Sequence, residues 1–237
     1  MSGSTISALW VYLAASPLLG LTLTLLAYQG GVWLFRCSGQ QAWANPVPLA
    51  ILFIGTLLWL TETPYATYFE GAQFVHFLLG PATVALAVPL YMQWKHLRRM
   101  ALPLLVALLA GSAAAAFSAM GIASWLGASP ETVRSLAPKS VTTPIAMAVA
   151  EQIGGLPSLT AVLVVITGIT GTLCFPAFFR LLKIRNPAAQ GFAAGLSAHG
   201  LGTARAFLIS EEVGAFAALG MGLNGIVTAV FLPLLLR

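Results

Sequence analysis

The stretch "APKSVTTPIA", residues 137–146, interrupts an otherwise very apolar chain. Pro138 and Pro144 enclose a run that contains a lysine, a serine and two threonines. Because proline lacks an N–H group and clashes with the preceding turn, one continuous helix cannot run through this stretch. The sequence therefore predicts that helical structure is interrupted here, in the middle of an apolar protein, and that the interruption contains a charged residue.

The overall composition indicates that the solvent around the protein is lipid. Of the 237 residues, 59% are apolar and only 7% are charged, against roughly 25% charged residues in soluble domains. The mean hydropathy is +0.91. The net charge of +5 does not indicate nucleic-acid binding, because the basic residues stand in short clusters between apolar runs, as in the cytoplasmic loops of membrane proteins.

The apolar runs predict an all-α polytopic membrane protein. A spanning helix needs about 20 mostly apolar residues, and about seven stretches meet this length. Their approximate ranges are 6–28, 46–62, 72–94, 101–126, 157–180, 187–209 and 213–236. The segment 138–155 is too short and too interrupted for a complete span. Since no stretch is polar enough for a soluble domain, we expect a single integral membrane domain over residues 1–237.

Charged residues orient the predicted spans. Most basic residues fall in four places: Arg36; Lys95, Arg98 and Arg99; Arg180, Lys183 and Arg185; and Arg237. The positive-inside rule puts these places in the cytoplasm, so the N-terminus is expected outside and the C-terminus inside. Segment 138–155 must then begin and end on the same side, as a re-entrant segment or a pair of half-spans.

Two parts of the sequence resemble each other. The run "LAILFIGTLLWLTETP" at 49–64 is similar to "LTAVLVVITGITGTLCFP" at 159–176, and "GPAT" at 80–83 is similar to "GLGT" at 200–203. By the charge count, the spans of the two parts run in opposite directions. This predicts an inverted repeat with broken helices, in halves of roughly 45–127 and 138–236, an arrangement common in secondary transporters.

The short glycine motifs supply the first candidate binding residues. Gly80, followed by a proline, and Gly200 with Gly202 are expected to break helices in mid-membrane. Broken helices leave free N–H groups and a positive dipole end, which attract small anions. Thr83 and Thr203 add hydroxyl donors that are expected to face one cavity. The alternative is a simple kink whose threonine bonds back to its own helix.

Lys139 is the central candidate, because an ionisable residue inside a membrane is a functional hypothesis by default. Its neighbours Ser140, Thr142 and Thr143 add hydroxyl donors, and the set suits a carboxylate. The alternative is a loop lysine solvated by water.

Two further polar residues stand in apolar surroundings. His199 adjoins the second glycine motif, either as a ligand or as a satisfied core residue. Asn224 lies in the last predicted span and either faces the cavity or bridges helices.

The sequence carries no signature of an enzyme. It has no Cys/His zinc spacing, no pair of acids, no G-x-S-x-G motif and no phosphate loop followed by lysine. We therefore expect no catalytic residue, metal or cofactor. The coupling ion of a transporter, H⁺ or Na⁺, stays open.

Four stretches give the chain a resemblance to the LrgB/CidB family: "HFLLGPATVALAVPLY" (76–91), "LAPKSVTTPIA" (136–146), "AHGLGTARA" (198–206) and "GLNGIVTAVFLP" (222–233). The resemblance extends to the C-terminal half of the plant plastidal glycolate/glycerate translocator. It implies a multi-pass protein of the bacterial cytoplasmic membrane that works with a small LrgA/CidA-type membrane partner, in a homo- or hetero-oligomer.

The resemblance leaves two functions open. Family members are described as holin- or antiholin-like regulators of murein hydrolase export and autolysis, whereas plastid relatives carry glycolate and glycerate and some bacterial members are tied to pyruvate uptake. A pore former needs only packing helices, but a transporter needs a specific site with breaks in both halves. The predicted breaks favour transport of a small monocarboxylate.

Overall fold

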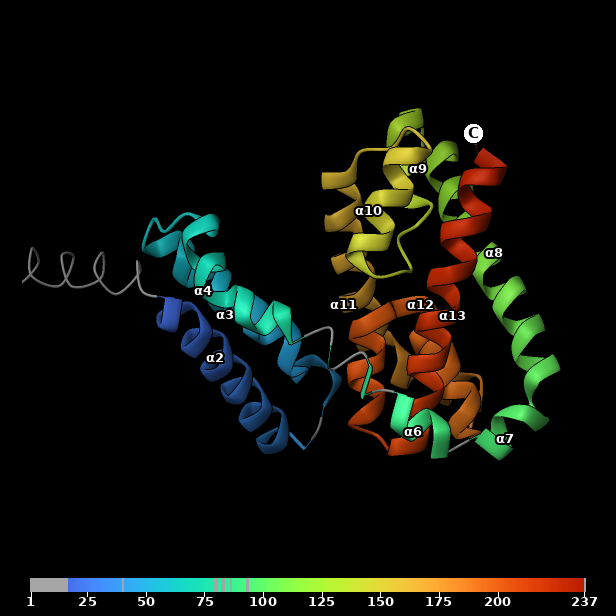
Figure 1. The fold of residues 1–237 in the computed structure, drawn as a ribbon, viewed down its shortest axis with the longest axis horizontal. Helices are drawn as coiled ribbons and strands as arrows, with labels where there is room; N and C mark the ends of the chain where they lie inside the picture. Colours follow the sequence, from blue (N-terminus) through green and yellow to red (C-terminus); the bar gives the residue numbers. More distant parts are fainter. Residues whose placement is uncertain are drawn as a thin grey trace, which may run out of the picture. The chain divides into compact units, whose positions relative to one another are not determined.

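The computed structural model describes residues 17–39, 41–78, 81, 84–85, 87–92 and 94–236, and their regular elements are all helical. The chain forms two compact units, Met1–Ala85 and Leu86–Arg237, whose helices are drawn in Figure 1. The boundary between these units, at Ala85 and Leu86, falls inside the first predicted repeat half, 45–127, and not between the two halves. The single membrane domain stays a prediction. Gly80 and Thr83 lie outside the described residues.

The first unit contains α2 (Pro17–Cys37), η1 (Ala42–Ala44), α3 (Pro46–Leu60) and α4 (Tyr65–Phe77). Helix α2 packs against both α3 and α4, and the Thr24 hydroxyl forms a 2.7 Å hydrogen bond with the Tyr68 hydroxyl. The predicted range 6–28 for the first span is displaced, because α2 continues through two glycines to Cys37. Packing of this part of α2 on α3 outweighs the low helix propensity of glycine.

The second unit contains the remaining helices. They are α6 (Ala87–Met92), α7 (Trp94–Arg99), α8 (Ala101–Trp125), α9 (Pro130–Leu136), α10 (Thr143–Gln152), α11 (Pro157–Leu181), α12 (Pro187–Phe207) and α13 (Glu211–Leu236). The predicted span 72–94 is not one helix, since α4 ends at Phe77 and α6 begins at Ala87. Pro81 follows Phe77 by four residues, and since a proline ring clashes with the carbonyl one turn before it, α4 does not continue through Pro81.

Four described helices are long and apolar enough to cross a membrane: α2, α8, α11 and α13. Helix α3 has 15 residues, fewer than the roughly 20 that a span needs. These helices make the chain a multi-pass membrane protein. The count of seven spans stays a prediction.

A first hairpin, residues 130–155, begins and ends at the same end of the second unit (Figure 1). Ser135 joins its two ends: the Leu156 amide donates to the Ser135 hydroxyl at 2.8 Å, and the Thr160 hydroxyl donates to the Ser135 carbonyl at 3.0 Å. Between the helical arms α9 and α10, residues 137–142 form a non-helical tip. At about 1.5 Å per residue, the ten residues of α10 cover about half of a 30 Å hydrocarbon core.

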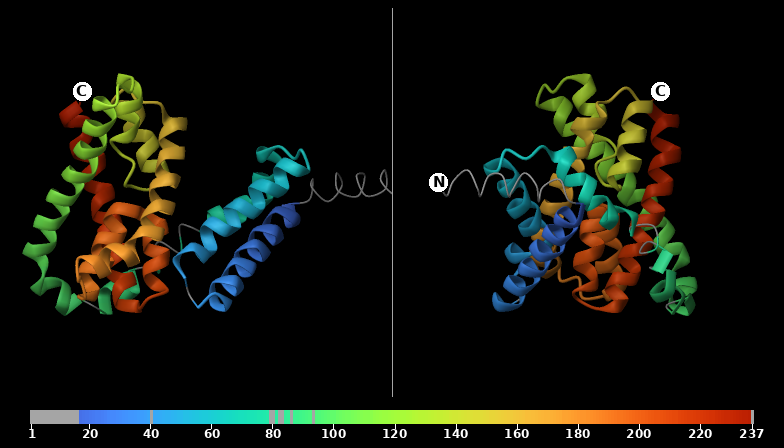
Figure 2. Two further views of the ribbon diagram at one scale, coloured as in Figure 1. Left: turned by 180° about the vertical axis from the view of Figure 1, so that it is seen from behind. Right: turned by 60° about the vertical axis from the view of Figure 1, so that its left-hand side comes forward.

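A second hairpin, residues 187–207, replaces the straight span predicted at 187–209. Non-helical dihedral angles at Ala198 (φ −127°, ψ 21°) and His199 (φ 42°, ψ −132°) divide α12 into two arms. The arms fold back on each other so closely that a Cβ atom on Gly202 would overlap the Ala194 carbonyl. Figures 1 and 2 show α12 confined to the end of the unit where α6 lies, while α13 continues to the opposite end.

The reversal changes the direction of the last helix. Gly191 lies against the Val213 carbonyl and Gly195 against the Ala217 carbonyl, so the first arm of α12 runs parallel to α13. Near its C-terminal end, α13 packs against the base of the first hairpin through Leu232, which clusters with Ile153. The predicted position of the C-terminus on the side of the basic loop at 180–185 is therefore wrong, because α12 turns back instead of crossing.

Candidate functional site

The tips of the two hairpins meet at Asn224, near the middle of α13. The Asn224 Nδ2 group donates to the Leu196 carbonyl at 2.8 Å and to the Ser140 carbonyl at 3.3 Å. Its Oδ1 atom accepts from the Ser112 hydroxyl of α8 at 2.6 Å and from the Thr228 hydroxyl at 3.3 Å. Asn224 is 1% exposed. The sequence left two roles open for Asn224, and the structure shows both, since the side chain bridges helices and also lines the cavity described below.

The orientation of the Asn224 amide follows from its partners. Carbonyl oxygens only accept hydrogen bonds, so the group that faces Leu196 and Ser140 must be the NH₂. The Ser112 and Thr228 hydroxyls must then donate to Oδ1. One buried side chain thus satisfies groups from both hairpin tips, α8 and α13.

His199 forms the tip of the second hairpin and is buried. Its Nε2 atom lies 3.0 Å from the Val164 carbonyl of α11, and since a carbonyl only accepts, Nε2 carries the hydrogen. The positive φ of 42° costs a residue other than glycine about 1–3 kcal/mol and persists only where the surroundings hold it. The helix breaks at Ala198 and His199, not at Gly200 and Gly202 as predicted.

Thr203 matches the alternative given for its motif, a kink in which the threonine bonds back to its own helix. Its buried hydroxyl donates to the His199 carbonyl, one turn back in the same arm, at 2.9 Å, and lies 3.7 Å from the Met221 sulfur. Gly200 has open space where a Cβ atom would be. The hydroxyl of Thr203 therefore stabilises the backbone after the tip.

Lys139 lies at the tip of the first hairpin and is partly buried. Its Nζ atom donates to the Ser140 hydroxyl at 3.3 Å. Since lysine only donates, the O–H of Ser140 is not consumed by this bond. Among the described residues no carboxylate pairs with the Lys139 ammonium, so its positive charge lacks an acidic partner near the middle of the unit.

Two backbone N–H groups of the first tip are already hydrogen-bonded to nearby carbonyl groups. The Lys139 amide donates to Leu136 and the Val141 amide to Pro138, both at 3.2 Å. Thr142 is the N-cap residue of α10, and Thr143 is its first residue. Pro144 stands in the first turn of α10, where its missing N–H costs nothing, so the helix resumes there.

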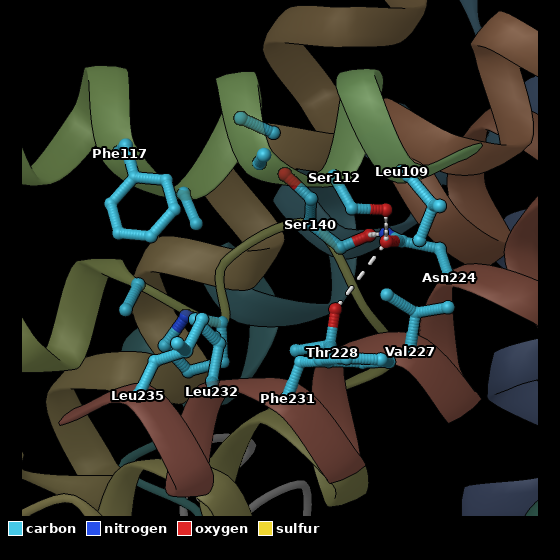
Figure 3. A pocket seen from close by; sticks show the side chains of 15 residues that line it. Leu109, Ser112, Phe117, Ser140, Asn224, Val227, Thr228, Phe231, Leu232 and Leu235 are labelled. Carbon is cyan, nitrogen blue, oxygen red and sulfur yellow. Dashed lines mark hydrogen bonds between the residues drawn. The ribbon is translucent and has the colours of Figure 1, made fainter. Parts of the chain in front are cut away.

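A cavity of about 180 Å³ lies between α8, α13 and the first tip. Figure 3 shows Ser112, Ser140, Asn224 and Thr228 gathered in one part of it. Phe117, Leu232 and Leu235 lie in the other part. The cavity is much smaller than the roughly 300–1,000 Å³ of drug-sized sites, which favours a small ligand.

The cavity gathers only some of the predicted residues. Ser140 and Asn224 line it. The other described candidates do not line it and surround the two tips instead: Lys139, Thr142, Thr143, His199, Gly200, Gly202 and Thr203. Sequence reasoning missed Ser112, whose signal was a hydroxyl inside the small-residue run "GSAAAA" at 111–116.

The comparison with known families covers most of the chain. Residues 24–237 match the model of the LrgB-like family. The chain belongs to the LrgB-like family. This confirms the resemblance on which the sequence analysis relied.

Several relatives match this LrgB-like protein over nearly their whole length. The uncharacterized protein YwbG of Bacillus subtilis (strain 168) is 37% identical over 92% of this chain and 97% of its own. The uncharacterized protein YxaC of the same strain is 34% identical over 90% and 92%. The antiholin-like protein LrgB of Bacillus cereus (strain B4264) is 29% identical over 92% and 95%. No solved structure matches.

Proposed function

We propose that this protein is a secondary transporter of small monocarboxylates of the pyruvate, glycolate or glycerate class. The observation that carries the proposal is the meeting of the two hairpin tips, 137–142 and 198–199, at the buried Asn224. Non-helical backbone at membrane depth is tolerated where it is buried in protein or lines a cavity. Transporters bind their substrates at such breaks near the bilayer midplane.

The chemistry of the tips supports an anionic substrate. Helix α10 begins at the first tip, and the arm 200–207 begins at the second, so both present helix N-termini towards the middle of the unit. The positive end of a helix dipole stabilises an anion. Lys139 adds a full charge without an acidic partner among the described residues, and the Ser140 hydroxyl connects that charge to the cavity wall.

The two hairpins, each with the helix that follows it, are proposed to form an inverted repeat of 129–180 and 186–236. Each copy starts with an N-cap residue and a proline, Ser129-Pro130 and Asn186-Pro187. Each final helix carries a proline near its end, Pro176 and Pro233. This register differs from the halves 45–127 and 138–236 that the sequence predicts.

Accessibility from the two sides of the membrane tests both hairpins. In a cysteine-free background, single cysteines at Ser129 and Ser158 are expected to react with a membrane-impermeant thiol reagent from one face. Cysteines at Arg185 and Ser210 are expected to react from the opposite face. All four residues are exposed. Labelling of Arg185 and Ser210 from opposite faces contradicts the second hairpin and the repeat together.

A second candidate is an antiholin-like regulator of murein hydrolase export and autolysis. The similarity to the antiholin-like protein LrgB of Bacillus cereus favours it. A regulator of this kind needs packing surfaces for a membrane partner, such as an LrgA/CidA-type protein, but it does not need a substrate cavity or an unpaired lysine. Those two features make transport the preferred proposal.

Uptake by proteoliposomes tests transport directly. We expect purified protein, reconstituted with or without an LrgA/CidA-type partner, to accumulate labelled pyruvate, glycolate or glycerate against empty liposomes. Imposed H⁺ and Na⁺ gradients identify the coupling ion. Absence of uptake for all three acids under both gradients, with and without the partner, refutes the transport proposal and leaves the antiholin-like regulator. We propose no enzymatic step and place the protein in the bacterial cytoplasmic membrane.

A further inference from the structure

The two proposed repeats, 129–180 and 186–236, align without a gap. Identical residues stand 57 positions apart at several places along them: Pro130 and Pro187, Ser140 and Ser197, Gly168 and Gly225, and Pro176 and Pro233. The breaks in the two hairpins keep this spacing, since Thr142, the N-cap residue of α10, stands 57 positions before His199. Each residue of one repeat therefore has a counterpart in the other.

This register gives the polar residues of the cavity counterparts at the second tip. Asn224 corresponds to Thr167 on α11, and Ser140 corresponds to Ser197. Among the described residues none forms a hydrogen bond with the Thr167 hydroxyl, and the Ser197 hydroxyl donates to the Ala193 carbonyl of its own arm. The Thr167 hydroxyl is therefore available to a ligand.

Thr167 lies on the face of α11 that contacts the second tip. It follows Val164 by three residues and precedes Gly171 by four, and residues at these spacings are neighbours on one helix face. The Val164 carbonyl lies 3.0 Å from the Nε2 atom of His199, and a Cβ atom on Gly171 would lie 2.7 Å from the Cβ atom of Ala198. Contacts with the second tip thus stand on both sides of Thr167.

The second hairpin packs on α11 more closely than the first hairpin packs on α13. A Cβ atom on Gly168 would overlap the Leu201 side chain. A Cβ atom on Gly225, the counterpart of Gly168, would meet only the Ile145 Cδ1 atom, at 3.1 Å. The two repeats therefore differ in conformation: a cavity lies beside the first tip, whereas the second tip is closed on its helix.

We propose that Thr167 and Ser197 form a second binding site for the same small carboxylate, on the opposite side of the membrane from the cavity. The site opens when the second tip leaves α11, while the first tip closes the cavity at α13. The proposal rests on the transport function proposed above and supplies its alternating access, which inverted repeats provide by moving one half against the other.

The side on which each site opens follows from the two hairpins, which begin at opposite ends of the unit (Figure 1). The cavity is lined by Leu232, which clusters with Ile153 at the base of the first hairpin. The counterpart of Leu232 is Phe175, which lies on α11 between Thr167 and the base of the second hairpin. The two sites therefore face opposite sides of the membrane.

Thiol labelling from each face tests the second site in the full-length, cysteine-free protein in sealed proteoliposomes. Ser112→Cys, in the cavity, is expected to react with a membrane-impermeant reagent from the face on which Ser129 lies. Thr167→Cys is expected to react from the opposite face, on which Ser210 lies. Unlabelled glycolate should slow both reactions. Labelling of Thr167→Cys from the same face as Ser112→Cys, or from neither face, overturns the proposal.

A glycine substitution tests whether closure of the second tip controls access. Gly168→Ala overpacks the contact with Leu201, so we expect it to raise the labelling rate of Thr167→Cys about tenfold and to lower that of Ser112→Cys. Gly222→Ala is the control, because no atom lies within 4 Å of its added Cβ atom. Equal labelling rates in folded Gly168→Ala and Gly222→Ala contradict the closed second site. Labelling of Thr167→Cys alone decides the question if Gly168→Ala does not fold.

Uptake measurements separate this proposal from the transport function. Uptake of labelled glycolate by the wild-type protein, combined with labelling of both cysteines from one face, overturns the second site and keeps transport. Absence of uptake for pyruvate, glycolate and glycerate refutes transport itself, and the second site with it as a substrate site.

Discussion

Lys139→Met is expected to abolish monocarboxylate binding while the protein still folds. Methionine keeps the length of the side chain and removes the charge next to the Ser140 hydroxyl. Loss of one partner of a desolvated charge pair costs about 2–5 kcal/mol, which corresponds to roughly 30- to several-thousand-fold in affinity. The dissociation constant for labelled acid in nanodiscs, and uptake by proteoliposomes, measure the effect.

Two further variants isolate the role of the Lys139 charge. Lys139→Arg should rescue binding only in part, because a flat guanidinium fills the site differently from a compact ammonium. Lys95→Met removes an exposed charge on α7 and should leave affinity unchanged. Wild-type affinity in Lys139→Met would make Lys139 a solvated residue of the tip, and the substrate's charge would need another partner.

Asn224→Leu is expected to have the largest effect on stability. Leucine has a similar volume but cannot donate to the Ser140 and Leu196 carbonyls, which lose their Asn224 partner. Each buried carbonyl left without a partner costs about 1–3 kcal/mol, so unfolding free energy should fall by about 2–6 kcal/mol. Thermal unfolding in nanodiscs, followed by helical circular dichroism, measures the loss.

Thr228→Val is the control for Asn224. It keeps the shape of the side chain and removes only one hydrogen bond of 3.3 Å, so we expect a loss of about 1 kcal/mol or less. Similar melting temperatures for Asn224→Leu and Thr228→Val would contradict the role of Asn224 as the link between the hairpin tips.

The sequence predicts the long helices well because lipid imposes a simple length rule. The ranges 101–126, 157–180 and 213–236 agree with α8, α11 and α13 to within a few residues. The break between Pro138 and Pro144 is also confirmed, since proline acts locally and needs no tertiary context.

The second hairpin escapes sequence reasoning for a physical reason. Glycine is the usual residue at positive φ, so the sequence predicts the break in the helix at Gly200 and Gly202. The chain instead reverses at His199, whose unfavourable φ of 42° is held by a contact with Val164. Such a contact joins residues that are far apart in sequence, and local propensity does not contain it.

The direction of α13 and the polar part of the cavity depend on this same tertiary information. A rule that counts apolar runs treats 187–209 as a complete crossing of the membrane. It then assigns the wrong direction to α13, the helix that follows. In the sequence, Ser112 is a single polar residue within a run of small packing residues. Only the fold shows that its hydroxyl bonds to Asn224.

The position of Asn224 near the end of the chain sets an order for biosynthesis. Its bonds close loops of 28, 84 and 112 residues, and such long-range contacts form late because closing long loops costs entropy. While the ribosome is still making α13, neither hairpin tip has its shared partner. A nascent chain that stops before residue 224 therefore lacks the side chain that links the two hairpin tips.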